Sequence, residues 1–381
     1  MSFLNRCVLA CVLCFAVALA VATSAPGESD DFLQVTGPCR LEFPRDHGGH
    51  PGYRTEWWYY TGNVETDDGR RYGFQFTIFR RQLRAAESPS PRNPGERSAW
   101  RTNQIYIGHA AVSDIGAKRH HHAETMSRGI EMLAGIRRSD DTFRIHLKAW
   151  EAVISPERHR LKVDGPDFGY ELELAPEKPP VLHGESGYSR KGAAPDRASC
   201  YYSLTRLRAT GTLRIGAESV VVRGLAWMDH EYSSAYLEPG LAGWDWFSLQ
   251  LSDETELMVF LMRRNDGARS PFSSGTFVGK DGGMVRLDRE SFDVTPGGEW
   301  RSARSGAVYP LKWRIDVPRA GLTLAVEAAF PDQEMETPRT TGVTYWEGSV
   351  SATGSRAGRP VTGRGYVEMT GRTGKGFEAP L

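Results

Sequence analysis

The chain has 381 residues, which is long for one domain and suits two. Its 47 basic and 47 acidic residues leave no formal net charge, so the electrostatic footprint of a nucleic-acid-binding protein is missing. Aromatic residues and turn formers are both numerous, with 10 Trp, 14 Tyr and 16 Phe beside 41 Gly and 22 Pro. This mixture is typical of a β-protein.

The first segment has the features of a targeting signal. Arg6 precedes an apolar run at 7–22, and small residues follow it. We therefore predict a signal peptide over 1–24, a polar tether over 25–40, and export to the periplasm or cell envelope. An uncleaved membrane anchor is the alternative, although the run is shorter than the roughly 20 residues that a spanning helix needs.

Export changes the interpretation of the cysteines. Three of the five lie in the predicted signal, which leaves Cys39 and Cys200 in the mature chain. An oxidising compartment permits a disulfide between them, but their separation does not determine whether it forms.

Alternation of apolar and polar residues dominates the mature chain and predicts half-buried antiparallel strands. In 70–81, for example, Tyr72, Phe74, Phe76 and Ile78 share one face. The same pattern recurs at 143–150, 170–175, 211–215, 221–227, 245–251, 256–262, 311–317, 322–330, 345–350 and 365–370. Asp-Gly pairs between these segments indicate hairpin turns.

The strand pattern breaks at 235–241 and then resumes. We therefore predict an all-β protein with an N-terminal domain at 41–236 and a C-terminal domain at 237–376. Roughly eight strands in each domain suit two tandem β-barrels, and barrels of that size can hold one apolar ligand. One short helix is expected within 122–135, and a long polar loop at 83–103.

The densest group of chemically capable residues lies at 224–234, GLAWMDHEYSS. On a strand, Trp227, Asp229 and Glu231 share one face, and His230 lies on the other. The two carboxylates would stand about 7 Å apart. A carboxyl held among apolar walls stays protonated and can act as an acid, whereas the alternative is that both acids pair with arginine and fix a strand end. His230 is the best candidate for a proton shuttle.

Aromatic residues elsewhere are candidates for a ligand-binding wall. Trp57 and Tyr59 share one face in TEWWYYTGNV, and Trp244 and Trp246 share one in GWDWFSLQL. His109 is either a buried structural histidine or a pocket residue. Plain core packing is the alternative for the aromatic residues.

Signatures of other enzyme classes are missing. The chain has no GxSxG, HExxH or P-loop motif. The consecutive His120, His121 and His122 would alternate faces in a strand, with basic residues beside them, so we expect no metal site. No cofactor is expected either.

Nine short motifs run in order across 55–371 and carry a family resemblance. They are TEWWYYTGN, IYIGHAAVSD, HHHAETMSRG, GYSRKG, CYYSLTRL, WMDHEYSS, GWDWFSLQL, YWEGSV and GRGYVEMTG. Together they resemble the AttH-like, predicted secreted hydrolase branch of the carotenoid 1,2-hydratase (CrtC) group. The resemblance implies two tandem lipocalin-like barrels and kinship with enzymes that hydrate isoprenoid double bonds.

In those hydratases the acid aspartate lies in a Tyr-x-Asp segment. The matching segment here is Trp227-Met228-Asp229, so the resemblance implies that Asp229 is the acid, with Trp227 in place of the tyrosine.

Two functions from different classes follow. The leading hypothesis is an enzyme that protonates and hydrates a large apolar molecule, an isoprenoid or lipid, with Asp229 as acid and Glu231 or His230 positioning water. Its aromatic walls would stabilise developing positive charge. The alternative is a non-catalytic envelope lipid carrier, since AttH-like proteins resemble companions of ABC export systems. A glycan-binding module is a third, lesser possibility.

Overall fold

The computed structural model describes residues 32–85, 102–235 and 237–374. The predicted signal peptide, the first part of the tether and most of the predicted 83–103 loop lie outside these ranges. Within them the chain is nearly all β, and its helices are two single turns, η1 (Arg45–His47) and η2 (Pro318–Ala320). None of the described helices is long and apolar enough to cross a bilayer.

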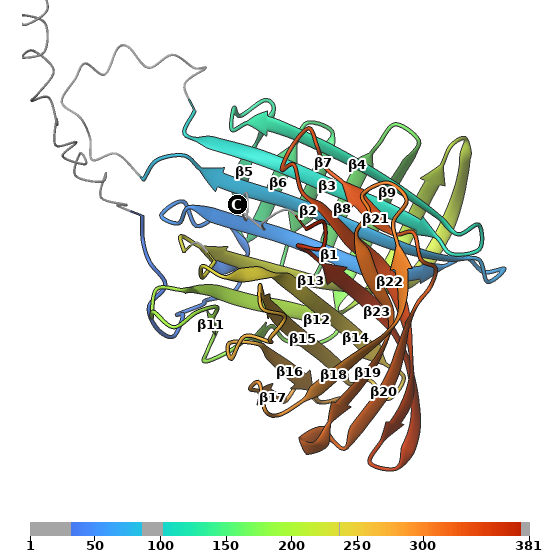
Figure 1. The fold of residues 1–381 in the computed structure, drawn as a ribbon. Helices are drawn as coiled ribbons and strands as arrows, with labels where there is room; N and C mark the ends of the chain where they lie inside the picture. Colours follow the sequence, from blue (N-terminus) through green and yellow to red (C-terminus); the bar gives the residue numbers. More distant parts are fainter. Residues whose placement is uncertain (1–31, 86–101, 236, 375–381) are drawn as a thin grey trace, which may run out of the picture. The chain divides into compact units, whose positions relative to one another are not determined.

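The first thirteen strands form one antiparallel sheet (Figure 1). Its order is β4-β3-β2-β1-β13-β12-β9-β8-β7-β6-β5, and β10 and β11 also pair with β12. The strands are β1 (Thr55–Glu65), β2 (Arg71–Gln82), β3 (Gln104–Asp114), β4 (Arg119–Arg128), β5 (Ala134–Ser139), β6 (Thr142–Leu147), β7 (Trp150–Ile154), β8 (His159–Asp164), β9 (Phe168–Pro176), β10 (Val181–Leu182), β11 (Tyr188–Arg190), β12 (Ala198–Ile215) and β13 (Glu218–Ser233).

The remaining ten strands form a second antiparallel sheet, in the order β17-β16-β15-β14-β23-β22-β20-β19-β18, with β21 paired to β22. They are β14 (Leu241–Leu251), β15 (Glu256–Arg264), β16 (Ser274–Val278), β17 (Met284–Leu287), β18 (Asp293–Arg301), β19 (Val308–Val317), β20 (Leu322–Ala328), β21 (Glu334–Glu336), β22 (Thr344–Arg356) and β23 (Arg359–Met369).

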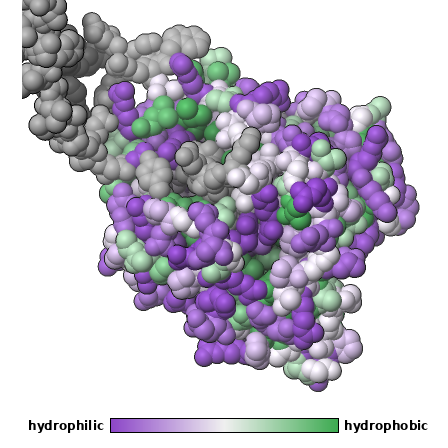
Figure 2. Space-filling model, in the orientation of Figure 1, coloured by the Kyte–Doolittle hydropathy of each residue, from purple (hydrophilic) through white to green (hydrophobic). Residues whose placement is uncertain are grey.

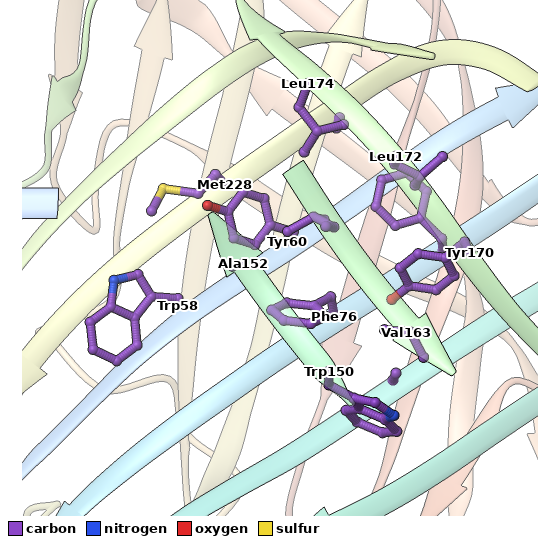
Figure 3. Close-up of a cluster of buried hydrophobic side chains, with 14 of the residues drawn as sticks. Trp58, Tyr60, Phe76, Trp150, Ala152, Val163, Tyr170, Leu172, Leu174 and Met228 are labelled. Carbon is purple, nitrogen blue, oxygen red and sulfur yellow. The ribbon is translucent and has the colours of Figure 1, made fainter. Parts of the chain in front are cut away.

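Each sheet curls in a barrel-like way around its own apolar core because its alternating side chains share one inner face. Figure 3 shows part of the core of the first sheet. There Tyr60 of β1 lies between Met228 of β13 and Phe76 of β2, and Trp58 of β1 and Tyr170 of β9 lie on opposite sides of this group. On the face drawn in Figure 2 the surface is mainly hydrophilic, with separate hydrophobic patches.

The predicted fold class is confirmed, and most predicted strand segments lie in strands. Two are partly wrong: 143–150 includes the turn between β6 and β7, and 322–330 runs past the end of β20 at Ala328. The structure has more strands than expected because the chain between 119 and 190 folds into several short ones, which the alternation pattern does not separate. The two-domain division stays a prediction, although the change from one sheet to the other falls between Ser233 and Leu241, at the predicted break.

The helix expected within 122–135 is wrong. Residues up to Arg128 continue β4, and β5 begins at Ala134. β4 pairs with β3 along its whole length, from Arg119 opposite Asp114 to Arg128 opposite Ile105. Pairing with an available strand edge therefore overrides the weak helical spacing of the apolar residues.

A disulfide joins Cys39 to Cys200 in the structure. It ties the segment before β1 to β12, where Val35 and Tyr232 pack in the same small apolar cluster. The sequence left this bond open, and the fold brings the two residues together.

Candidate functional site

A cavity of about 190 Å³ lies between the two sheets. Both sheets contribute to its wall, which is more apolar than polar. It is lined by Thr55, Trp57, Tyr59, Gln75, Thr77, Phe79, His109, Lys191, Ala198, Ser199, Tyr201, Asp229, Glu231, Ser233, Ala235, Leu237, Trp244, Trp246, Phe260, Thr341, Val343, Tyr345, Glu347, Glu368 and Thr370.

Strand register explains why these side chains meet. On β1 and β13, Tyr59 lies opposite Asp229 and Trp57 lies opposite Glu231. On the second sheet, Trp246 of β14 lies opposite Glu368 of β23. Alternate residues of a strand share a face, so the Tyr59–Asp229 pair and the Trp57–Glu231 pair point to the same side of the first sheet.

Asp229 is a buried carboxyl with three hydrogen-bond donors. Tyr201 donates its hydroxyl to Oδ2 at 2.8 Å, Trp227 donates Nε1–H to Oδ1 at 2.7 Å, and Ser203 donates its hydroxyl to Oδ1. Burial raises the pKa of Asp229 to about 7, although the three donors oppose the rise. This carboxyl is therefore divided between its acid and its ionised form near neutral pH.

Two further acids enter the cavity from the second sheet. Glu347 of β22 and Glu368 of β23 are directly opposite each other, and like charges in that position repel. Burial, helped by the charge of Glu368, holds the pKa of Glu347 well above its usual range. Burial, helped by Asp229 and Glu231, raises the pKa of Glu368 to about 8. Burial therefore favours the protonated form of both acids.

Glu231 differs because it has a partner of opposite charge. Its Oε1 lies 3.1 Å from Nζ of Lys191 and accepts the hydroxyl of Ser199. The Lys191 ammonium also lies over the ring of Phe260, 4.3 Å from its centre. Glu231 is thus the acid of the cavity that is paired with a positive charge.

Aromatic rings form the wall around these acids. Tyr59 and Trp246 meet edge to face with ring centres 5.3 Å apart, and Trp227 and Trp246 meet likewise at 6.2 Å. Trp246 donates Nε1–H to the Tyr201 hydroxyl at 3.1 Å, so the hydroxyl that holds Asp229 is itself fixed. Such rings attract positive charge through their faces.

Two polar atoms of the lining have no hydrogen-bond partner among the described residues. They are Oε1 of Gln75 and Oε2 of Glu347, and both are buried. Burying a polar atom without a partner costs about 1–3 kcal/mol, so a bound polar group or water at this place would stabilise the site.

Comparison with known proteins identifies the family. The AttH-like family model matches residues 34–372, which is most of the chain. The chain belongs to the AttH-like family. No curated protein matches it.

Two solved structures are similar to this AttH-like protein. One is a protein assigned to AttH from Nitrosomonas europaea, which is 33% identical, with a TM-score of 0.77 over 90% of this chain and 100% of that one. The other is kievitone hydratase from Nectria haematococca, which is 16% identical, with a TM-score of 0.64 over 89% of this chain and 95% of that one. At that identity the second likeness concerns the fold alone.

The AttH-like fold brings most of the predicted site residues to one cavity. The lining includes Asp229 and Glu231 together with the predicted binding residues Trp57, Tyr59, His109, Trp244 and Trp246. Trp227 lies directly behind the lining and contacts Asp229 through its indole N–H.

His230 is not brought to the cavity. It lies on the opposite face of β13 and belongs to a polar group that we call the Glu56 cluster: Asp46, His50, Glu56, Arg80 and His230, which are buried except for the partly exposed His50. Nε2 of His230 is 2.9 Å from Oε1 of Glu56. His230 is separated from Asp229 and Glu231 because neighbouring residues of a strand point to opposite faces.

The Glu56 cluster is also the one set of three close metal-type ligands among the described residues, through His50, Glu56 and His230. Its ligand atoms are already hydrogen-bonded to one another, and Nε of Arg80 lies 2.9 Å from Glu56. The fixed positive charge of Arg80 disfavours a cation here, so we assign the cluster to structure.

The other histidines are held by neighbours. His109 contacts the hydroxyl groups of Tyr345 at 2.9 Å and Thr340 at 3.0 Å, and burial lowers its pKa to about 4. It is therefore a neutral residue at the junction of the two sheets. His120 contacts Ser113, whereas His121 points the other way, toward Asp167.

Sequence reasoning missed several residues of the site. Lys191, Tyr201 and Glu368 lie in the family motifs GYSRKG, CYYSLTRL and GRGYVEMTG, but none of the three was predicted to be a site residue. A carboxylate on the inward face of a strand was the available signal for Glu347 and Glu368. Alternation alone could not show that this face meets the other sheet.

Proposed function

We propose that this AttH-like protein is an exported hydratase-type enzyme that adds water to a double bond at the end of an apolar molecule. The observation that carries the proposal is the state of Asp229, a buried acid with a pKa of about 7 inside an aromatic cavity. A general acid works best when its pKa lies near the working pH.

The chemistry would proceed in two proton transfers. Protonated Asp229 gives its proton to one carbon of the double bond, and positive charge develops on the other carbon beside the aromatic wall. Water attacks that carbon, and Glu231 accepts the proton that the water loses. The two residues lie two positions apart on one face of β13, so their Cα atoms are about 7 Å from each other, which leaves room for the reacting carbons and the water between the side chains.

The unpaired oxygens of Gln75 and Glu347 support a role for water or a hydroxyl group in the cavity. A solely apolar ligand would leave both unsatisfied. Kinship of fold with a protein named as a hydratase is consistent with the proposal.

The cavity volume bears on the choice between enzyme and carrier. About 190 Å³ is close to an engineered cavity of roughly 150 Å³ that holds one benzene. A space of this size encloses the reacting end of an isoprenoid or lipid, whereas a carrier has to shield most of its cargo. We therefore favour the enzyme, and the ABC-transporter partner belongs to the carrier alternative.

Export is part of the proposal. The apolar run at 7–22 motivates it, and the disulfide between Cys39 and Cys200 is of the kind that persists in oxidising compartments. Detection of the mature chain in the periplasmic fraction, beginning near residue 25, is the expected result.

The test begins with the ligand. Native mass spectrometry with lipid extraction, on protein purified from the envelope of its own host, should release an isoprenoid or lipid that becomes the substrate for an assay. Asp229→Asn should then lower turnover by about 10²–10⁴ with ligand binding retained.

Asp316→Asn, which changes an aspartate of β19 outside the cavity, is the control and should leave turnover unchanged. Full turnover in Asp229→Asn would refute the acid mechanism. Retained ligand transport in that variant, without chemistry in the parent, would favour the carrier.

A further inference from the structure

The two oxygens of Asp229 have different surroundings. Oδ2 accepts from Tyr201, which lines the cavity, whereas Oδ1 accepts from Trp227 and Ser203, which do not. Oδ2 is therefore the oxygen on the cavity side. A proton on Oδ2 can reach a ligand, and a proton on Oδ1 faces the buried donors instead.

A buried hydrogen-bond chain continues behind Ser203. Nε2 of His183 lies 2.6 Å from Oγ of Ser203, and Nδ1 of His183 lies 2.8 Å from Oγ1 of Thr276. All three side chains are buried. Thr276 belongs to β16, so the chain joins the acid on the first sheet to the second sheet.

The His183 ring carries one N–H, because burial and, to a lesser extent, the charge of Lys191 lower its pKa to about 3. If that N–H is on Nε2, it donates to Ser203, and the Ser203 hydroxyl donates to Oδ1 of Asp229. If it is on Nδ1, Nε2 accepts from Ser203, and Oδ1 has to carry the proton in order to bond to Ser203.

We propose that His183, as the Nε2–H tautomer, is a positioning residue that keeps Oδ1 of Asp229 an acceptor and so places the acidic proton on the cavity-side Oδ2. Trp227 acts in the same direction, since its indole N–H can only donate and already occupies Oδ1. The inference rests on the proposed function of Asp229 as the acid, but the hydrogen-bond arrangement itself needs no substrate.

Other ionisable groups face this chain from several strands. Asp229 is faced by Tyr59 of β1, Tyr201 of β12, Glu231 of β13 and Glu368 of β23. His183 is faced by Lys191 and by the ring of Tyr201, whose centre is 4.2 Å from that of the imidazole. The two ring nitrogens of His183 are hydrogen-bonded to the hydroxyl groups of Ser203 and Thr276, which do not titrate near neutral pH. The tautomer is therefore expected to persist while the acids around Asp229 titrate.

The direct test is the tautomer of His183 in the unmodified protein. Two-bond ¹⁵N–¹H correlation spectra of the ¹⁵N-histidine-labelled mature chain should show Nε2–H for His183 from pH 5.5 to pH 9, with the signal assigned by its loss in His183→Gln. An Nδ1–H tautomer anywhere in this range would overturn the proposal.

A second measurement follows the acid. Ser203→Ala removes one donor from Oδ1, which should raise the Asp229 pKa by about 1, as read from the ¹³C shift of its labelled carboxyl. Ser302→Ala is the matched control, because Ser302 is a buried serine that donates to Glu334 at 2.6 Å outside the cavity. It should leave both the Asp229 pKa and the His183 tautomer unchanged.

An Asp229 pKa that is the same in Ser203→Ala and the parent would also overturn the proposal, since Oδ1 would then not depend on the chain. Neither measurement requires turnover. If both succeed and Asp229→Asn still turns over substrate, the proposed function fails while the His183 arrangement stands.

Discussion

The two faces of β1 and β13 carry buried polar groups of opposite character. On one face the Glu56 cluster pairs its charges: His50, His230 and Arg80 all bond to Glu56. Burial alone would raise the pKa of Glu56, but the charge of His50 and the hydrogen bonds hold it well below its usual range. On the cavity face, Asp229, Glu347 and Glu368 have raised pKa values.

Burial therefore does not decide the charge of an acid by itself. Both faces are buried, and Asp229 and His230 are neighbours in sequence. The two faces differ in the groups around their acids. On one face Glu56 contacts a guanidinium and a charged imidazole, whereas on the other face Asp229 is surrounded by neutral hydrogen-bond donors and other acids. Paired charge stabilises the fold, whereas unpaired acids are a feature of functional sites that the rest of the fold has to tolerate.

The largest expected effect comes from breaking the paired face. Arg80→Met should lower the free energy of unfolding by about 3–5 kcal/mol, because it leaves the buried Glu56 with less compensation. Urea unfolding is the measurement. Arg158→Met, which removes an exposed ion pair with Glu173, should change stability by less than about 1 kcal/mol. Equal losses in the two variants would contradict the comparison.

On the cavity face the opposite sign is expected. Asp229→Asn should raise the free energy of unfolding by about 1–3 kcal/mol at pH 8. At that pH the parent holds an ionised, buried Asp229, which destabilises the folded state, whereas the variant has no charge at this position. The Asp229 pKa is raised to about 7, so its stabilising contribution is complete below about pH 4 and is lost as pH rises to 7. The gain in the variant should therefore disappear near pH 4, and a gain independent of pH would argue against this origin.

The pH dependence of the paired face can be followed through His50. Burial would lower its pKa, but Glu56 and Asp46 raise it to about 9. Its contribution to stability is complete below about pH 6.5 and is lost as pH rises through 9. Unfolding free energies of the parent minus those of His50→Gln should fall by about 2 kcal/mol between pH 6.5 and 9.5. A flat difference would mean that His50 is neutral in the fold.

The smallest effect concerns the aromatic wall. Trp57→Leu should weaken binding of the co-purified ligand about tenfold, because a ring that lines the cavity is lost while apolar volume is largely kept. Isothermal titration calorimetry measures this effect. Trp300→Leu replaces a tryptophan of β18 outside the cavity and should leave affinity unchanged.

The local features of this protein follow from its amino-acid pattern. Alternation at period 2 placed the strands and assigned faces within each one, so Asp229 and Glu231 were correctly separated from His230 on β13. The break in the strand pattern at 235–241 coincides with the passage of the chain from one sheet to the other. The local pattern failed at 122–135, where an open strand edge and not local spacing decided the structure.

Which strand faces meet depends on the packing of the two sheets. Glu347 and Glu368 reach Asp229 because β22 and β23 of the second sheet come to lie against β1 and β2 of the first. His183 and Thr276 meet for the same reason, although they are 93 residues apart in the sequence. Periodicity reports whether a side chain is buried, but the partner that sets its charge comes from the packing of two sheets, which no local pattern encodes.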